Sequence, residues 1–261
     1  MSLTGKTPAD TYKDLLYVDN NNSGADSTVR SVKTGNGSAT GLELSTRHLR
    51  FSPDADTTST LTVRDADDNV KLQVDTTNDQ VKALGHHINT QYAYFGISHS
   101  VSNGFLANTH HPIPFSNMAT DDSEDTVGFG TSTDPATSFT TADDPATDAS
   151  NLVPMFWYVP DNISIDSVIG IEGGDNATGD TTRMHLMSYD FTSGSTSCLT
   201  NGTLLAHNSD VTNAGSEQAY SSTFTIDSAS VTSGKVILAF FRSDSINSDY
   251  SVNITVKYHL T

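Results

Sequence analysis

The first 85 residues combine many short strand-like segments with few large apolar side chains. Polar and apolar residues alternate in five segments, with the period of a strand that has one buried face: residues 29–33, 41–45, 60–64, 70–74 and 81–84. Gly, Asn and Asp clusters between them predict hairpin turns. Ordering the backbone costs entropy, and burial of so thin an apolar face offsets little of it. We therefore expect identical chains to complete the interior; an independent small β domain or a partly disordered arm are the alternatives.

Composition narrows the classes of protein further. Of the 261 residues, 35% are apolar, a low share for one compact domain, so two β-rich regions fit better. Acidic residues outnumber basic ones by 31 to 13, which gives a net charge of −18. Such a chain repels phosphate backbones and anionic membranes, so we expect no nucleic-acid partner. The longest apolar run, residues 236–241, has strand length, which predicts no membrane insertion.

A second region begins near residue 86, where the aromatic content rises. Gly, Asn and Asp turns separate the strands that we expect, and helical periodicity is confined to residues 227–233. This pattern predicts an all-β chain, with an intertwined, short-stranded region over 1–85 and an antiparallel jelly-roll β-sandwich over 86–261. The strands expected in the sandwich are residues 92–97, 153–160, 163–172, 182–189, 221–226, 235–242 and 250–260.

Residues 117–151 interrupt this second region. They are rich in Asp, Thr, Ser and Pro, and the sequence of residues 134–137 is repeated at 144–147. The stretch has no period of two or of 3.6 residues. We expect a long surface loop that buries nothing.

Several acidic groups have the residue types of cation sites. Asp65, Asp67 and Asn69 have the spacing of a calcium loop, but Val70 stands where that loop requires glycine, so a hairpin turn is expected instead. A second group could hold a hard cation or form a solvated loop: Asp121, Asp122, Glu124 and Asp125.

The paired histidines His86-His87 and His110-His111 could ligate a transition metal around a three-fold axis. Adjacent residues of a strand point to opposite faces, so each pair can present only one ring to such an axis. Cys198, the single cysteine, excludes an intramolecular disulfide and is expected to be a small buried side chain. We therefore predict no bound metal and no cofactor.

Catalytic motifs are incomplete. Residues 5–7 resemble the end of a phosphate-binding loop, but the glycine that should precede them by five positions is missing. The sequence has no Gly-x-Ser-x-Gly elbow and no acid pair in a glycosidase context, so we predict no catalytic residue and no enzyme activity. Aromatic rings stack on sugars, which makes five side chains candidates for host contact, with core packing as the alternative: Trp157, Tyr158, Tyr189, Tyr220 and Tyr250.

Characteristic stretches occur at both ends of the chain, at residues 5–19, 22–24 and 28–30, and at 159–162, 184–187, 217–220 and 242–250. The first group resembles the opening of fibre and minor structural proteins of marine tailed bacteriophages. The second group is similar to the jelly-roll heads that end many such proteins. The resemblance covers both ends but not the Asp-rich loop.

This resemblance implies a homotrimeric tail fibre or spike on the virion exterior, assembled in the host cytoplasm. Residues 1–85 would form the attachment and shaft portion, and residues 86–261 the head. The implied partners are further copies of the chain, tail or capsid proteins of the virion and a host surface glycan. A capsid decoration or cement protein is one alternative, and a carbohydrate-binding module or glycan depolymerase is another.

Overall fold

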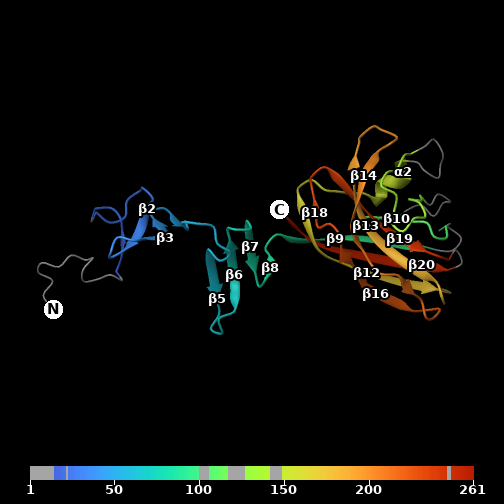
Figure 1. Cartoon of the computed structure of the whole chain (residues 1–261), viewed down its shortest axis with the longest axis horizontal. Helices are drawn as coiled ribbons and strands as arrows, with labels where there is room; N and C mark the ends of the chain where they lie inside the picture. Colours follow the sequence, from blue (N-terminus) through green and yellow to red (C-terminus); the bar gives the residue numbers. More distant parts are fainter. Residues whose placement is uncertain (1–14, 22, 100–105, 117–126, 142–148, 246–247) are drawn as a thin grey trace, which may run out of the picture. The chain divides into compact units, whose positions relative to one another are not determined.

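The computed structural model describes residues 15–21, 23–99, 106–116, 127–141, 149–245 and 248–261 (Figure 1). The chain divides into two compact units, Met1–Ile88 and Asn89–Thr261, whereas the sequence placed the boundary between residues 85 and 86. Antiparallel strands form nearly all of the regular structure, as predicted. Among the described residues, no helix is both long and apolar enough to cross a bilayer.

The first unit contains two four-stranded antiparallel sheets. Strands follow the order of the chain in each sheet, and short turns connect all successive strands except β1 and β2. The first sheet comprises β1 (Leu16–Val18), β2 (Arg30–Thr34), β3 (Ala39–Leu44) and β4 (Leu49–Phe51). The second comprises β5 (Leu61–Arg64), β6 (Val70–Asp75), β7 (Gln80–Ala83) and β8 (His86–His87).

The five alternating segments of the first unit are confirmed as strands β2, β3, β5, β6 and β7. The turns also follow the predicted chemistry, since Gly37, Asp68 and Asp79 have φ values of 88°, 64° and 53°. Gly, Asn and Asp adopt this left-handed region more readily than other residues. The short strands β1, β4 and β8 were not predicted, because two or three residues carry no measurable period.

The apolar side chains of the first unit are mostly left in contact with solvent. Within the described residues 15–88, Val32 is the one buried apolar side chain. Seven of the described large apolar side chains are between 48% and 68% exposed. They are Leu15, Leu16, Leu49, Phe51, Val63, Leu84 and Ile88.

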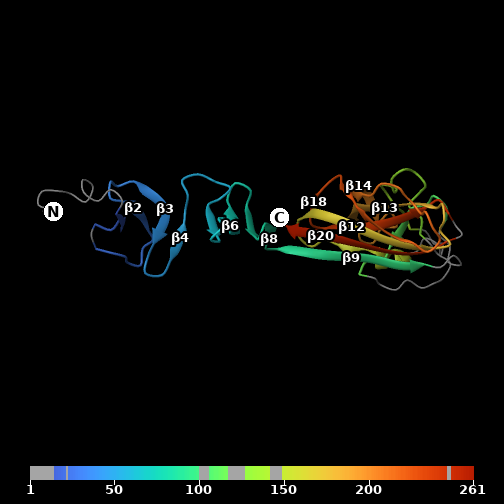
Figure 2. The ribbon, with the colours of Figure 1, turned by 90° about the horizontal axis from the view of Figure 1, so that it is seen from below.

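The second unit contains two antiparallel sheets that pack face to face as a β-sandwich (Figure 2). The larger sheet has the order β10 (His111–Ile113), β19 (Lys235–Ser243), β13 (Thr181–Phe191), β14 (Leu199–His207) and β17 (Thr225–Ile226), with β11 (Trp157–Tyr158) on β19 and β15 (Val211–Thr212) on β13. The smaller sheet has the order β16 (Ala219–Thr223), β12 (Ile163–Asp175), β20 (Asp249–Leu260) and β9 (Thr90–His99), with β18 (Ser230–Val231) on β12.

The main core lies between these two sheets. Alternate residues of β12 and β20 point inward, for example Val168 and Ile254, and meet Met184 and Leu186 of β13. The sheets approach closely at Gly170, where a Cβ atom would lie 2.7 Å from the Met184 side chain and 2.9 Å from the Phe224 ring. Only glycine fits this position without displacement of its neighbours.

A second core covers the opposite face of the larger sheet. Phe240 and Tyr189 project from the sheet and pack against Phe129 and Leu152. Residues 149–155 form the short helices α2 (Ala149–Leu152) and η3 (Val153–Met155). The larger sheet is therefore buried on both faces.

Three expectations are wrong. The Asp-rich stretch 117–151 was expected to bury nothing, yet Val127 and Phe129 are buried, because the sheet beneath offers an apolar surface that two side chains can reach. The strand expected over 153–160 is reduced to β11, since residues 149–155 are helical. The helix expected over 227–233 is absent, and β18 occupies part of that range.

Candidate functional site

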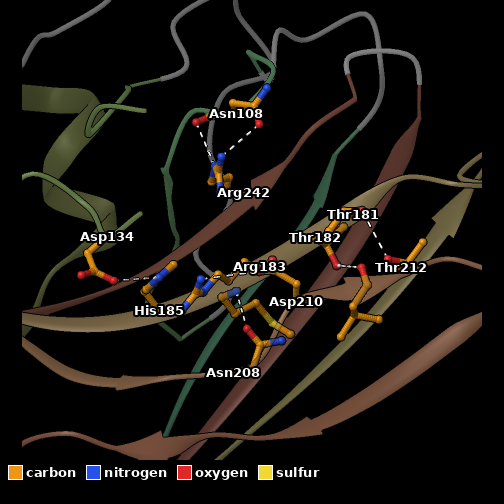
Figure 3. Close-up of polar contacts among 12 residues, drawn as sticks. Asn108, Asp134, Thr181, Thr182, Arg183, His185, Asn208, Asp210, Thr212 and Arg242 are labelled. Carbon is orange, nitrogen blue, oxygen red and sulfur yellow. Dashed lines mark hydrogen bonds and ion pairs between the residues drawn. The ribbon is translucent and has the colours of Figure 1, made fainter. Parts of the chain in front are cut away.

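A polar cluster lies on the outer face of the larger sheet, beside the second core (Figure 3). Arg183 and His185 of β13 share this face because they are two residues apart, and β19 contributes Arg242. The described segments 106–116 and 127–134 cover the cluster and contribute His110 and Asp134. The site thus joins the sheet to the segment that covers it.

His185 is the centre of this cluster. Its ring is fully buried and lies 4.8 Å from the ring of His110, at an interplanar angle of 82°. Among the described residues, neither ring nitrogen of His185 has a hydrogen-bond partner, and the Asp134 Oδ1 atom is 3.5 Å from Nε2. Burial, with smaller contributions from nearby His110 and Arg183, lowers the pKa of His185 to about 2. The imidazole is therefore neutral in the folded protein.

His110 and His111 are held in place by hydrogen bonds to the covering segments. Nε2 of His110 donates to the Ser132 carbonyl at 2.9 Å, and burial lowers the pKa of this ring. His111 accepts a hydrogen bond from the Leu106 N–H at Nε2 (3.0 Å) and donates from Nδ1 to the Val127 carbonyl (3.0 Å). Both rings connect the covering segment to β10.

Arginine side chains hold the rim of the cluster. Arg242 donates from Nε to the Asn108 carbonyl and from Nη2 to Asn108 Oδ1, both at 3.0 Å. Asn108 has a φ of 59°, and its backbone N–H donates to the Ser243 carbonyl at 2.7 Å. The Asn108 contacts fix the covering loop against β19. Arg183 Nη1 lies 3.6 Å from Oδ1 of Asp210, in the connection between β14 and β15.

The chemistry open to this cluster is limited. Within the described part of the second unit, no three ligand atoms of His, Cys, Asp or Glu lie close enough together to share a metal ion. In this cluster His110 and His111 make hydrogen bonds that fix their rings, whereas His185 makes none to the described residues. We interpret the cluster as a buried polar contact that holds the covering segments on the larger sheet.

A buried carboxyl group occupies the opposite side of β13. Glu172 of β12 is 1% exposed and accepts a hydrogen bond from the Thr182 hydroxyl at 2.5 Å. Its second oxygen has no hydrogen-bond partner in the part of the chain that the structure describes. Burial raises the pKa of Glu172 to about 7, although the bond from Thr182 acts in the opposite direction. Sequence inspection did not identify this residue, because its position among alternating residues does not reveal which face is enclosed.

The aromatic candidates for host contact divide into two groups. Trp157 is 6% exposed and its ring stacks on Phe115, with 6.0 Å between centroids. Tyr189 is fully buried and donates to the Ala136 carbonyl at 2.8 Å, and Tyr250 is also buried. Tyr158 is 56% exposed, and the partly exposed Tyr220 donates from its hydroxyl to the Gln218 side chain. Of the five, Tyr158 and Tyr220 therefore reach the surface.

The candidate calcium loop forms a hairpin turn. Asp65 Oδ1 accepts hydrogen bonds from the backbone N–H groups of Asp67 and Asn69 at 3.0 and 2.8 Å. Asp65 Oδ2 also lies 2.8 Å from the Lys71 ammonium group. Cys198 is buried, as expected. Residues 5–7 and the acidic group at 121–125 lie outside the described residues.

The outer face of the smaller sheet differs from these sites because no described segment of the second unit forms a buried apolar cluster on it. Cross-strand pairing aligns Tyr94, Thr255, Ile169 and Thr223 in one row. The next row contains Gly96, Asn253, Ile171 and Ser221, and the rows on either side contain Tyr92, Lys257, Ser167, Ser98, Ser251, Gly173 and Ala219. We call these four rows the neutral face, since Lys257 is their single charged side chain.

No protein-family model matches this sequence, and no curated protein matches it at a significant level.

Proposed function

We propose that this chain is a non-enzymatic structural protein of a virus particle. It assembles as a homotrimeric tail fibre or spike of a tailed bacteriophage. The first unit attaches the protein to tail or capsid proteins, and the second unit is a jelly-roll head that contacts the host. The resemblance of both chain ends to phage fibre proteins is the origin of this proposal.

The observation that carries the proposal is the incomplete interior of the first unit. Eight strands leave one described apolar side chain buried, and Leu84 and Leu49 are 68% and 62% exposed. Small sheets of this kind need an additional apolar layer to be stable. Neighbouring copies of the same unit supply that layer in an intertwined fibre, which resists dissociation because separation exposes the shared apolar surface.

The second unit supports the role of a head. Its antiparallel sheets have the two-layer architecture on which jelly rolls are built, and its long strands leave turns at both ends of the sandwich. The net charge of −18 of the whole chain favours solubility and disfavours contact with phosphate-rich surfaces. Adhesion would then depend on uncharged or cationic groups of the host surface.

Light scattering by the purified full chain tests the assembly. We expect a mass three times the 27.8 kDa of one chain, unchanged on dilution into the nanomolar range. A mass of 27.8 kDa would contradict the trimer. Labelling of virus particles with an antibody against the head then separates a tail fibre from a capsid decoration protein, because the label falls on the tail in the first case and on the shell in the second.

A further inference from the structure

We infer that the neutral face of the second unit is the surface through which the heads of neighbouring copies contact one another. This inference rests on the proposed assembly of identical chains, and it assigns a second contact, separate from that of the first unit. The partner is a further copy of the same chain. The exposure and charge of the neutral face and its position in the sandwich support this contact.

Apolar side chains on the neutral face are exposed to solvent. The larger sheet is covered on both sides, whereas the smaller sheet packs on one side alone. Ile169 and Ile171 stand near the middle of the open side and are 46% and 49% exposed, and Tyr92 and Tyr94 extend the apolar area onto β9. Solvated faces of antiparallel sheets usually carry polar side chains at such alternate positions. Neighbouring exposed apolar side chains mark interaction surfaces.

Charge selects the partner. The chain carries 31 acidic residues, but none of the outward positions in the four rows is acidic. Carboxylates appear at the two ends of the face, with Asp166 beside His259 at one end and Asp175 paired with Asp249 at the other. Copies that each carry a charge of −18 repel one another over most of their surface. The neutral face is where two copies can approach closely without burying like charges.

Side-chain size fits close contact between sheets. Thr255, Ser221 and Thr223 surround the two isoleucines, and Gly173 and Ala219 flatten one end of the face. Small and β-branched side chains allow sheets to pack face to face at about 10 Å. Their hydroxyl groups bond to water or to a neighbouring copy, so the contact needs no charged partner.

Thiol protection in the full chain tests this inference. Cys198 is buried, and burial raises the pKa of its thiol, so an introduced cysteine supplies the reactive group. Ile171→Cys places a thiol on the neutral face, and Val153→Cys places one on η3, where Val153 is 59% exposed. Both variants replace an exposed β-branched residue, which makes them a matched pair.

We expect the Ile171→Cys thiol to react with iodoacetamide roughly tenfold or more slowly than the Val153→Cys thiol in the assembled protein, because reaction requires opening of the contact. An assembled protein in which both thiols react at similar rates would overturn the inference and leave the proposed function intact. A chain that is monomeric at all concentrations would overturn both.

Discussion

Residues 15–88 and residues 89–261 are built from the same kind of antiparallel strand, yet their apolar side chains differ in environment. In the first unit Val32 alone is buried among the described apolar residues, and Phe51 is 48% exposed. In the second unit two clusters enclose aromatic and aliphatic side chains on both faces of the larger sheet. Alternation and turn chemistry are thus sufficient to define strands, whereas a core also requires enough large side chains to fill the space between two layers.

The largest expected effect comes from separating the units. A fragment of residues 89–261 should melt cooperatively as a folded protein, because its cores are complete within that range. A fragment of residues 1–88 should either remain unfolded or associate, since its sheets lack an opposing layer. Circular dichroism during heating, combined with light scattering, measures both. A monomeric, cooperatively melting fragment 1–88 would remove the basis of the comparison.

Truncation of one phenylalanine in each unit gives the next largest effect. Phe241→Ala empties a fully buried position that contacts the Tyr250 ring, so the free energy of unfolding should fall by about 3–5 kcal/mol. Phe51→Ala removes a half-exposed ring and should change it by less than about 1 kcal/mol.

The single tryptophan makes this pair easy to measure. Trp157 is buried in the second unit, so its fluorescence during urea unfolding reports that unit. Phe241→Ala should lower the urea midpoint, and Phe51→Ala should leave it in place. Equal shifts would mean that the two units unfold together.

Ionisation of Glu172 should lower the free energy of unfolding by up to about 3 kcal/mol at alkaline pH, because the pKa of this group rises from 4.5 to about 7 on folding. Between these values the folded state binds more protons than the unfolded state, so stability falls as pH rises through that window. Glu172→Gln removes this loss. The variant should be more stable than the natural protein above pH 7 and equal to it below about 4.5.

Urea midpoints at pH 4 to 8, read from Trp157 fluorescence, provide the test. Glu43→Gln in the first unit is the matched control, since it changes the same chemical group outside the sandwich and should leave these midpoints unchanged. A constant difference between Glu172→Gln and the natural protein at every pH would contradict the assignment of the effect to ionisation.

Glycine replacements in β12 should give the smallest effect. Gly170→Ala places a methyl group 2.7 Å from Met184 atoms, and the resulting overpacking should cost about 1–3 kcal/mol. Gly173→Ala on the same strand meets nothing closer than 3.9 Å. Urea titration should therefore show a lower midpoint for Gly170→Ala than for Gly173→Ala, and the reverse order would contradict the close approach of the two sheets.

Much of the strand content could be predicted from local pattern. Strands β12, β13, β19 and β20 begin within one residue of the predicted starts, because their long alternating runs leave little ambiguity. Prediction failed where contacts between residues far apart in sequence determine the local structure or the burial. Residues 227–233 lack a helix because Ser230 and Val231 pair with β12, and Phe129 is buried because a sheet surface distant in sequence receives it.

The candidate sites show the same division. Asp65 could be recognised as a turn residue, since its polar contacts reach no further than Lys71, six residues along the chain. The partners of His185 come from residues 110, 134 and 207, and no spacing rule links these positions. The neutral face also went unnoticed, because its rows unite residues from four separate strands.

The sequence by itself determined that this chain is all-β, acidic and divided near residue 86, and that its first unit is poor in apolar side chains. These properties follow from composition and from contacts between near neighbours. The tertiary structure decided which face of each sheet is enclosed, where His185 and Glu172 lie, and which sheet face remains open. Burial depends on the packing of segments far apart in sequence, and local periodicity carries no information about which segments meet.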